Sequence, residues 1–313
     1  MDWLIKSSMA SNILSKVCII IPVHNRIQYT LECIKSIYLQ SYKKINVIIV
    51  DDGSEDSSSD IIRQEFPQIN ILHGNGNLWW TGAMSKGVNE ILNNYNEKID
   101  YILSLNNDTV LARNTIEVLV DHIKRLKGKV IVGALSVNFS DQDTVLSSGY
   151  NITSWFFNRT KYPHLNSRIS NVPKEITPVD VLPGRCTLFP RRIFTEIGNY
   201  DAINFPHYNG DTEFTIRAKY KGWKLFIVPS AIVYEHQGET GLNPTFRTLN
   251  IKELFQSFFS IKSNNNIKIK TRFVFKVVPL YAKPTYLLFS YLKILIGSFI
   301  VVFNVLAGDK ELK

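Results

Sequence analysis

Three short polar clusters carry the side chains that are best suited to chemistry. Asp51-Asp52-Gly53-Ser54 and Asn106-Asn107-Asp108 each follow an apolar segment, and Gly210-Asp211-Thr212-Glu213 opens a helical pattern. Their chemical interpretations are a carboxylate for a nucleobase or ribose, a ligand for a hard cation, and a general base for a hydroxyl group. Asp, Gly and Ser also serve as turn and helix-cap residues, so the first cluster alone is equally compatible with a structural role, and a single Asp in a loop, as in the second, usually has no function.

The second cluster is suited to a metal–diphosphate complex. Mg²⁺ or Mn²⁺ bound to a diphosphate needs only one or two protein carboxylates, because phosphate oxygens and water fill the other positions. Asp108 is able to supply such a ligand, and His236 of Tyr234-Glu235-His236 is either a second ligand or a hydrogen-bonded structural histidine. Acids in a first helical turn are favoured by the helix dipole, so Asp211 and Glu213 keep a structural alternative.

Two common nucleotide-binding motifs are absent from the sequence. Gly74-Asn75-Gly76 begins like a dinucleotide fingerprint, but Trp79 stands where its third glycine is required. No GxxxxGK[ST] segment is present either. These absences argue against a nicotinamide-dependent oxidoreductase and a P-loop kinase.

The elements that must position these clusters alternate between strand and helix patterns. Short β-branched segments occur at 17–24, 45–51, 69–74 and 101–106, and one-sided apolar patterns occur at 31–38 and 116–126. Further helices are expected at 190–197 and 211–221, with a strand at 223–229. This order predicts an α/β fold with a mostly parallel sheet and helices on both faces. Ligands of such sheets bind at the carboxyl ends of the strands, where the first two clusters lie.

Composition favours a globular protein of a reducing compartment. The chain of 313 residues is 45% hydrophobic and 20% charged. Its three cysteines are scattered without a metal-binding spacing, and the first residues lack the apolar segment of a signal peptide. We therefore expect buried, reduced thiols and a cytoplasmic location.

Charge is unevenly distributed along the sequence. The formal net charge is +9, and residues 246–313 hold eleven Lys and Arg residues against three acids. The other 245 residues are nearly neutral, with 25 basic and 24 acidic side chains. A basic, apolar terminal segment is typical of contact with an anionic membrane surface, and we expect no nucleic-acid partner.

Seven motifs in order resemble glycosyltransferase family 2, in its bacterial rhamnosyltransferase-like branch. They are VCIIIPVHNR, IIVDDGS, GNGNLWWTGAMSKGV, LSLNNDT, LPGRCTLFPRRIFTEIGNYD, GDTEFTIRAKYKGW and YEHQGETG. The resemblance covers about residues 17–241 and implies the GT-A fold, a Rossmann-like, mostly parallel sheet between helices. We accordingly divide the chain into a catalytic domain at 1–245 and a basic, apolar helical tail at 246–313.

The resemblance also implies roles for single residues. Asp211 matches the catalytic base, Asp108 the metal-binding aspartate of the DxD motif, and His236 a late metal-binding histidine. A nucleotide-diphosphate sugar would be bound by residues in the matching motifs, namely Pro22, Val23, Asn25, Asp52, Asn77, a turn at Gly82-Ala83, Trp80, Asn107 and Glu213. For the neighbouring Trp79 and Trp80, stacking on a sugar ring and packing under the loop remain equal alternatives.

Two departures from the family pattern concern charge. Asn106 replaces the first acid of DxD, and Gly210 replaces the acid that usually precedes the base. Metal would then be held by Asp108, the diphosphate and His236.

The resulting hypothesis is an inverting, Mn²⁺- or Mg²⁺-dependent transferase that moves a sugar to a hydroxyl of a glycan or a lipid-linked acceptor. Such a role suits assembly of a bacterial surface polysaccharide. The alternatives are a sugar nucleotidyltransferase and a non-catalytic nucleotide-sugar-binding protein.

The segment 285–307 is apolar apart from Lys293 and is long enough to cross a bilayer. A charge near its middle favours a helix lying in the interface at the inner face of the cell membrane.

Overall fold

The alternation of strands and helices expected for the first 130 residues is present in the structure. It is a computed structural model and describes residues 15–95, 98–237 and 251–306. The first half contains β1 (Val17–Val23), α1 (Ile27–Tyr38), β2 (Ile45–Asp51), α2 (Ser58–Glu65), β3 (Asn70–His73), α3 (Trp79–Asn93), β4 (Tyr101–Ser104), β5 (Thr109–Leu111) and α4 (Thr115–Leu126). The four strands expected here agree with the observed ones to within two residues at either end.

The second half adds shorter strands, and then two helices that precede a last, long strand. It contains β6 (Val130–Asn138), β7 (Val145–Ser147), β8 (Asn151–Ser154), β9 (Arg159–Lys161), the 3-10 helix η1 (Ile169–Asn171), β10 (Thr177–Val179), β11 (Thr187–Pro190), α5 (Arg192–Glu196), α6 (Gly210–Tyr220) and β12 (Lys224–Glu235). The strand expected at 223–229 is therefore longer than its apolar pattern indicated, and it ends next to His236.

One mixed sheet forms the centre of the protein. Its strand order is β10-β12-β6-β11-β4-β1-β2-β3, with β5 paired to β12 and β7 to β6. The ladders β3-β2-β1-β4 and β6-β12 are parallel, and β11 is antiparallel to both of its neighbours, β4 and β6. The carboxyl ends of β1, β2, β4 and β12 and the start of β11 consequently lie along the same edge of the sheet.

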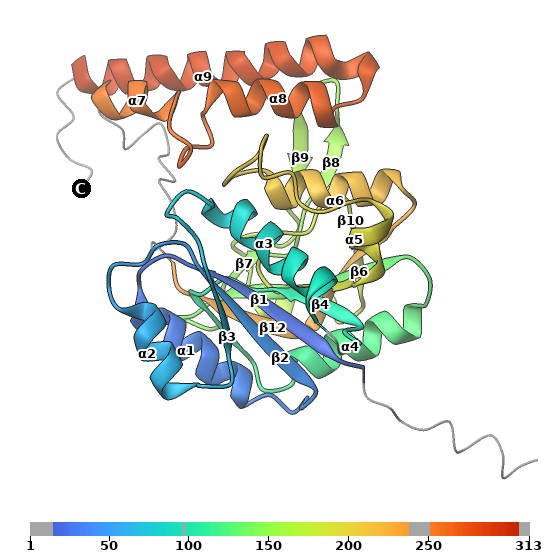
Figure 1. Ribbon diagram of the computed structural model, residues 1–313. Helices are drawn as coiled ribbons and strands as arrows, with labels where there is room; N and C mark the ends of the chain where they lie inside the picture. The colour runs from blue at the N-terminus through green and yellow to red at the C-terminus, as the bar shows by residue number, and fades with distance from the viewer. Residues whose placement is uncertain (1–14, 96–97, 238–250, 307–313) are drawn as a thin grey trace, which may run out of the picture.

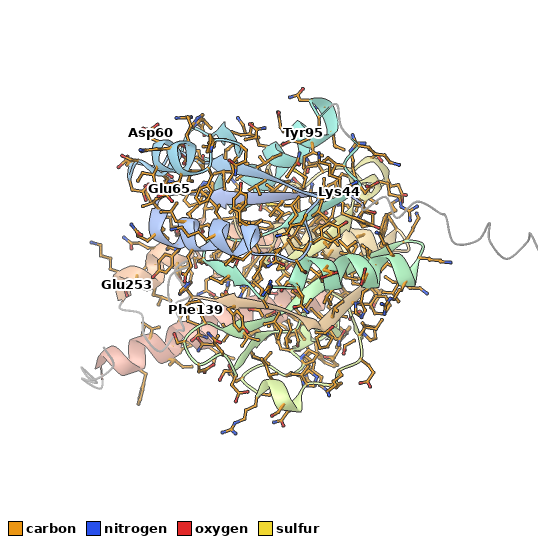
Figure 2. All side chains as sticks on the ribbon, turned by 90° about the horizontal axis from the view of Figure 1, so that it is seen from below. Lys44, Asp60, Glu65, Tyr95, Phe139 and Glu253 are labelled. Carbon is orange, nitrogen blue, oxygen red and sulfur yellow. The ribbon has the colours of Figure 1, made fainter. Side chains whose placement is uncertain are left out.

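Helices cover both faces of this sheet, as the sequence predicted (Figure 1). On one face α1, α2 and α4 pack on the sheet through a buried cluster that includes Ile34, Ile62 and Leu119. On the other face α3, α5 and α6 share a cluster that includes Met84 and Phe214. Viewed from below, side chains fill the space between the layers, and the exposed Asp60 and Glu65 of α2 lie at the rim (Figure 2).

Three further helices form a separate layer. They are α7 (Ile251–Ser257), α8 (Ile267–Val277) and, after the 3-10 helix η2 (Leu280–Ala282), α9 (Lys283–Leu306). Figure 1 shows α9 lying across the top of the molecule, with α7 and α8 beneath it. α8 buries its apolar side chains against residues of the preceding 245, including Val181, Phe205 and Ile216. The expected tail is thus packed on the α/β part through a shared apolar cluster.

We expect this shared cluster to contribute to the stability of the whole chain. Phe273 of α8 is 8% exposed and contacts Phe205, whereas Phe275 of the same helix is 60% exposed. Phe273→Ala should lower the free energy of unfolding by about 3–5 kcal/mol, because a buried aromatic ring is replaced by a cavity. Phe275→Ala is the matched control and should change it little. Urea denaturation of the full chain measures both, and equal effects would contradict the observed packing.

Candidate active site

Asp52 connects the end of β2 to the loop before α3. Its buried carboxylate accepts hydrogen bonds from the backbone amides of Gly76 and Trp79, both at 2.8 Å. Gly74 lies so close that an added Cβ would stand 2.4 Å from an Asp52 oxygen, so only glycine fits there. Asp52, expected to contact a nucleobase, therefore fixes the loop at this edge.

The residues after β1 form the neighbouring wall. The backbone amide of Asn25 donates to Ser54 Oγ at 2.8 Å, and Asn25 Oδ1 accepts the amide of Glu55 at 2.8 Å. Asn25 has a positive φ of 59°, a conformation that Asn tolerates better than most residues. Of the two other expected pocket residues, Pro22 is half-buried and Val23 is buried at the end of β1.

Trp80 packs into the site instead of lying over it. Its indole Nε1 donates to Asn106 Oδ1 at 2.9 Å, and its ring covers Gly184, where an added Cβ would be 2.1 Å from Cζ2. Of the two alternatives open for this residue, the structure has packing under the loop. The amide at Asn106, which replaces an acid of the family pattern, has an acceptor role toward Trp80.

Asp108 is the most unusual group at this edge. Its side chain is fully buried, and neither carboxylate oxygen has a hydrogen-bond partner among the described residues. The nearest cation in the ion pairs of Asp108 is Arg26, whose Nη1 lies 4.0 Å from Oδ2. Burial raises the pKa of Asp108 to about 6, and the negative charge of Glu235 contributes to the increase. An unpartnered buried carboxylate is costly, and a bound cation would relieve that cost.

Asp211 lies in the first turn of α6, as predicted. Its carboxylate accepts the backbone amides of Gly184 at 2.8 Å and Thr212 at 2.7 Å, and it remains half-buried. A carboxylate offers about four lone-pair positions, so these contacts leave capacity for a substrate proton. The preceding Gly210 would bring a Cβ within 2.1 Å of Thr81 Oγ1, which explains why no acid stands there.

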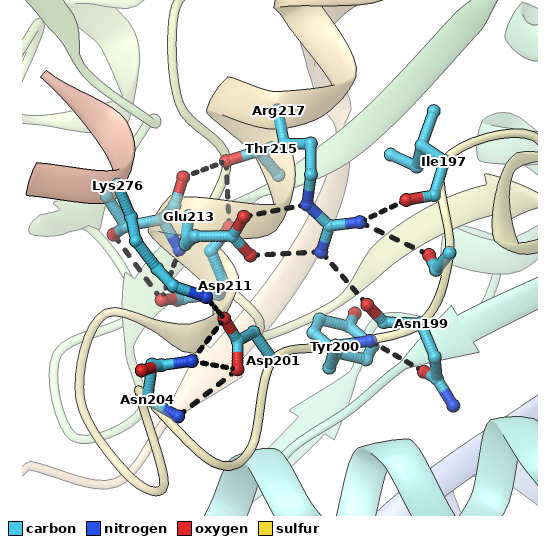
Figure 3. A network of polar contacts seen from close by, with 12 residues as sticks. Ile197, Asn199, Tyr200, Asp201, Asn204, Asp211, Glu213, Thr215, Arg217 and Lys276 are labelled. Carbon is cyan, nitrogen blue, oxygen red and sulfur yellow. Dashed lines mark hydrogen bonds and ion pairs between the residues drawn. The ribbon is translucent and has the colours of Figure 1, made fainter. Parts of the chain in front are cut away.

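Glu213 makes its contacts within the protein. Both of its oxygens bind Arg217, at 2.7 and 3.0 Å, and Arg217 also donates to the backbone carbonyls of Ile197 and Asn199 (Figure 3). Glu213 is 8% exposed. The observed contacts connect α6 to the loop after α5. They explain the burial of Glu213 without any contact with a nucleotide sugar.

Three other candidate residues lie in different surroundings. Asn107 Nδ2 donates to Thr30 Oγ1 at 3.0 Å, and Asn77 is exposed on the loop before α3. Gly82 was expected in a turn, and that expectation is wrong, because Gly82 is a buried residue of α3. The lack of a side chain there allows close contact with Leu78 and Ala202.

His236 follows β12 beside Asp108. Its backbone amide donates to the Asp108 carbonyl at 3.1 Å, while its ring Nε2 is 2.8 Å from Glu32 Oε2. The ring also lies between Tyr29 and Phe139, with centroid distances of 4.8 and 4.0 Å. This nitrogen is engaged by Glu32, and a ligand role for His236 stays a prediction.

Arg185 and Glu235 are prominent members of the site that the sequence analysis did not single out. Arg185 Nη1 lies 2.5 Å from both Glu235 oxygens, and Ser136 Oγ donates to Glu235 at 2.7 Å. Burial alone would lower the pKa of the Arg185 guanidinium, but the charges of Glu235, Asp211 and Asp108 together raise it. Arg185 therefore lies among three carboxylates. Only its place in the motif LPGRCTLFP hinted at a role, because pairing across the sheet is not visible in a sequence.

Comparison with known proteins identifies the family. The model of "Glycosyl transferase family 2" matches residues 18–198, which is more than half of the chain. The chain belongs to glycosyl transferase family 2. The matched segment includes Asp52, Asp108 and Arg185 and ends before Asp211.

Relatives of this glycosyltransferase differ in how much of their length is matched. The chain is 26% identical over 130 residues to "Glycosyltransferase GlyG" of Streptococcus pneumoniae serotype 4, and this covers 41% of each protein. It is 26% identical over 229 residues to "N-acetylglucosaminyl-diphospho-decaprenol L-rhamnosyltransferase" of Mycobacterium tuberculosis, covering 67% of this chain and 72% of that one. The match thus spans less than half of GlyG and most of the rhamnosyltransferase.

A solved structure confirms the GT-A fold. "GalNAc-T7 with UDP, GalNAc and Mn2+" aligns with a TM-score of 0.57 and 14% identity, covering 95% of this chain and 58% of that one. At this identity the likeness concerns the fold.

The site residues of this family member fit a divalent cation held jointly with a diphosphate. Among the residues that the structure describes, no group of three or more His, Cys, Asp and Glu side chains could hold a metal. The unpartnered oxygens of Asp108 nevertheless suit a hard cation whose remaining ligands are phosphate and water. Asp108 is the residue that would hold it.

The contrast between Glu213 and Asp211 gives a test of their assignments. Glu213→Gln should lower the free energy of unfolding by about 1–3 kcal/mol, because Arg217 loses a charge-assisted partner. Asp211→Asn keeps one of its two accepted backbone amides, because Gly184 and Thr212 donate to different oxygens, and should lower stability less than Glu213→Gln does. Thermal and urea denaturation of both full-length variants checks this. Equal stability of Glu213→Gln and the unsubstituted protein would show that the Arg217 network is not structural.

Proposed function

We propose that the protein is an inverting glycosyltransferase that moves a sugar from a nucleotide-diphosphate sugar to an acceptor hydroxyl. The observation that carries the proposal is the meeting of Asp108, Asp211 and Arg185 at one edge of the sheet. Family membership favours transfer over nucleotidyl chemistry. The UDP and Mn²⁺ in the GalNAc-T7 structure support a nucleotide-sugar donor and a divalent cation.

Asp211 acts as the general base in this proposal. The acceptor oxygen attacks the anomeric carbon, and its proton passes to the Asp211 carboxylate. The bond between the anomeric carbon and the phosphate oxygen breaks. The bonding electrons leave with the nucleoside diphosphate. One displacement from the opposite face inverts the anomeric configuration, so no covalent sugar–enzyme intermediate is required. The Gly184 and Thr212 amides hold the carboxylate in place for this proton transfer.

Asp108 would provide the direct protein ligand for Mn²⁺ or Mg²⁺. When bound, the cation would neutralise charge on the leaving diphosphate. Binding of this cation would also explain how the fully buried Asp108 carboxylate, which has no hydrogen bond among the described residues, is accommodated. His236 is proposed as a further ligand only if its ring is released from Glu32.

The acceptor is proposed to be a glycan or a lipid-linked glycan of a bacterial surface polysaccharide, handled at the inner face of the cell membrane. The rhamnosyltransferase relative, whose name specifies a diphospho-decaprenol acceptor, supports this choice. The tail also supports it, because residues 254–308 contain no acid. Lys262 of this segment lies over the first residue of α3, with Nζ 5.4 Å from the ring centre of Trp79.

The helical layer offers an apolar surface for the membrane. The segment Leu280–Phe303 is long and apolar enough to cross a bilayer by length and composition, with a mean hydropathy of 2.1. Only 22% of that window is buried in the protein. Lys293, the charge near the middle of this segment, donates from Nζ to the Asn158 carbonyl at 2.7 Å. We propose attachment in the plane of the interface, with Phe299 and Phe303 entering the lipid.

The catalytic assignment predicts the effect of Asp211→Asn. The substitution keeps the shape of the side chain and removes its capacity to take a proton. Turnover should fall about a hundred- to ten-thousandfold, with little loss of donor affinity. The measurement is nucleoside-diphosphate release from a panel of nucleotide sugars with Mn²⁺ and membrane extract. Near-normal turnover would show that another residue is the base, and donor binding without any turnover in the unsubstituted protein would indicate a non-catalytic binder.

The membrane assignment predicts selective sedimentation of the full-length protein with vesicles. Binding should be strong to vesicles containing phosphatidylglycerol and weak to pure phosphatidylcholine, because the tail is basic. The pair Phe299→Ser/Phe303→Ser should weaken binding at least about tenfold, since two apolar rings leave the lipid. Leu39→Ser is the control, because Leu39 is equally exposed but follows α1 on the opposite side of the molecule (Figure 1). Binding that ignores lipid charge and the phenylalanines would contradict the assignment.

A further inference from the structure

Arg185 lies at the edge of the sheet where a leaving group would depart. It precedes β11, which runs opposite to β4 and β6, so Arg185 lies beside the carboxyl end of β4 and the middle of β6. Its neighbour Gly184 contacts both the Trp80 ring and the Asp211 carboxylate. Arg185 is thereby fixed between the proposed base and the proposed metal ligand.

One nitrogen of the Arg185 guanidinium is bound within the protein, and the side chain as a whole is partly exposed. Glu235, only 7% exposed in its side chain, binds Nη1 of Arg185 and is itself fixed by Ser136. The Arg185 side chain remains 32% exposed. Every Arg185 hydrogen bond among the described contacts uses Nη1, whereas a guanidinium carries five N–H donors. Donors therefore remain for a ligand that enters the site.

The charges at this position balance those of a diphosphate only together with a cation, because three carboxylates surround Arg185 and Arg26 is the one further guanidinium beside them in the described part of the chain. Glu235 is ion-paired with Arg185 and orients its guanidinium. The charges of Asp211 and Asp108 also act on the guanidinium. Asp108 itself has no hydrogen bond to Arg185 or to Arg26, which stays 4.0 Å away. Two guanidinium groups beside a carboxylate that they do not bind are arranged to bind a further anion together with a cation.

We propose that Arg185, oriented by Glu235, binds the diphosphate of the donor and of the leaving nucleoside diphosphate. The inference deepens the proposed function and depends on it. Planar guanidinium groups bind phosphate oxygens through paired hydrogen bonds, which a lysine does not reproduce. Asn106 replaces the first acid of the DxD motif and accepts a hydrogen bond from Trp80, so the motif has one carboxylate fewer for a metal ion. Arg185 would supply positive charge to the diphosphate in addition to that of the metal.

The proposal requires that part of the diphosphate affinity is independent of metal. Binding of UDP, GDP and dTDP to the full-length protein is measured by calorimetry, with Mn²⁺ and again with EDTA. The corresponding monophosphates serve as probes that lack the second phosphate. Removing the Arg185 charge should weaken diphosphate binding about tenfold to a hundredfold under both conditions. The effect on the monophosphates should be smaller.

Arg185→Gln alone would leave the Glu235 carboxylate buried without a partner and could unfold the protein. The double variant Arg185→Gln/Glu235→Gln removes both charges and avoids that outcome. Glu235→Gln alone keeps Arg185 and should weaken diphosphate binding less than the double variant does. Arg192→Gln is a matched control, because Arg192 follows β11 at the end opposite to Arg185. Its side chain is 53% exposed and donates to the Gly128 carbonyl.

The outcomes separate this inference from the proposed function. Weaker diphosphate binding in the double variant, with an unchanged Arg192→Gln control, supports the inference. Unchanged diphosphate binding in the folded double variant overturns it and leaves the proposed function intact. Equal losses for monophosphates and diphosphates also overturn it, because they indicate a distorted nucleotide pocket. If the unsubstituted protein binds none of the nucleotides, the proposed function fails together with the inference.

Discussion

Burial of the Asp108 carboxylate without a hydrogen-bond partner in the described part of the chain is the constraint around which this site is organised. An isolated ionised carboxylate is strongly disfavoured away from water, and accordingly burial raises its pKa to about 6. The surrounding groups compensate only in part: Arg26 stays at 4.0 Å, and Arg185 is bound to Glu235. In the proposed function, a diphosphate-bound cation would supply the positive charge that these groups do not. Family membership and the GT-A fold are consistent with that requirement.

The remaining structure keeps this group and Asp211 at fixed positions. Parallel ladders bring the ends of β1, β2 and β4 together, and the antiparallel β11 delivers Gly184 and Arg185 to the same edge. The loop before α6 is further held by α8, because Lys276 donates to Asp201 at 2.6 Å (Figure 3). Arg272 of the same helix donates to the Ile203 carbonyl at 3.3 Å. The helical layer therefore has two connected roles. It presents an apolar surface to solvent, and it supports the loop that leads to the proposed base.

Local patterns were sufficient to predict most of the fold and part of the site. Strand patterns in the first half gave the bounds of four strands within two residues, whereas the first helix begins four residues before its apolar pattern, and the carboxyl-end rule located Asp52 and Asp108. The pairing of Arg185 with Glu235, 50 residues apart, depends on the register of β11, β6 and β12 and has no local signature. The same is true of Gly210 against Thr81 and of Trp80 with Asn106. Gly82 was misjudged for a related reason, since glycine marks close packing inside α3 as readily as a turn.

The most direct test of the account is a crystal structure of the full-length protein with Mn²⁺ and a nucleoside diphosphate. Anomalous scattering locates the metal independently of the protein coordinates. The account predicts a manganese peak about 2.1 Å from an Asp108 carboxylate oxygen, with phosphate oxygens as further ligands. A metal and diphosphate bound elsewhere, with the Asp108 oxygens still unpartnered, would contradict it.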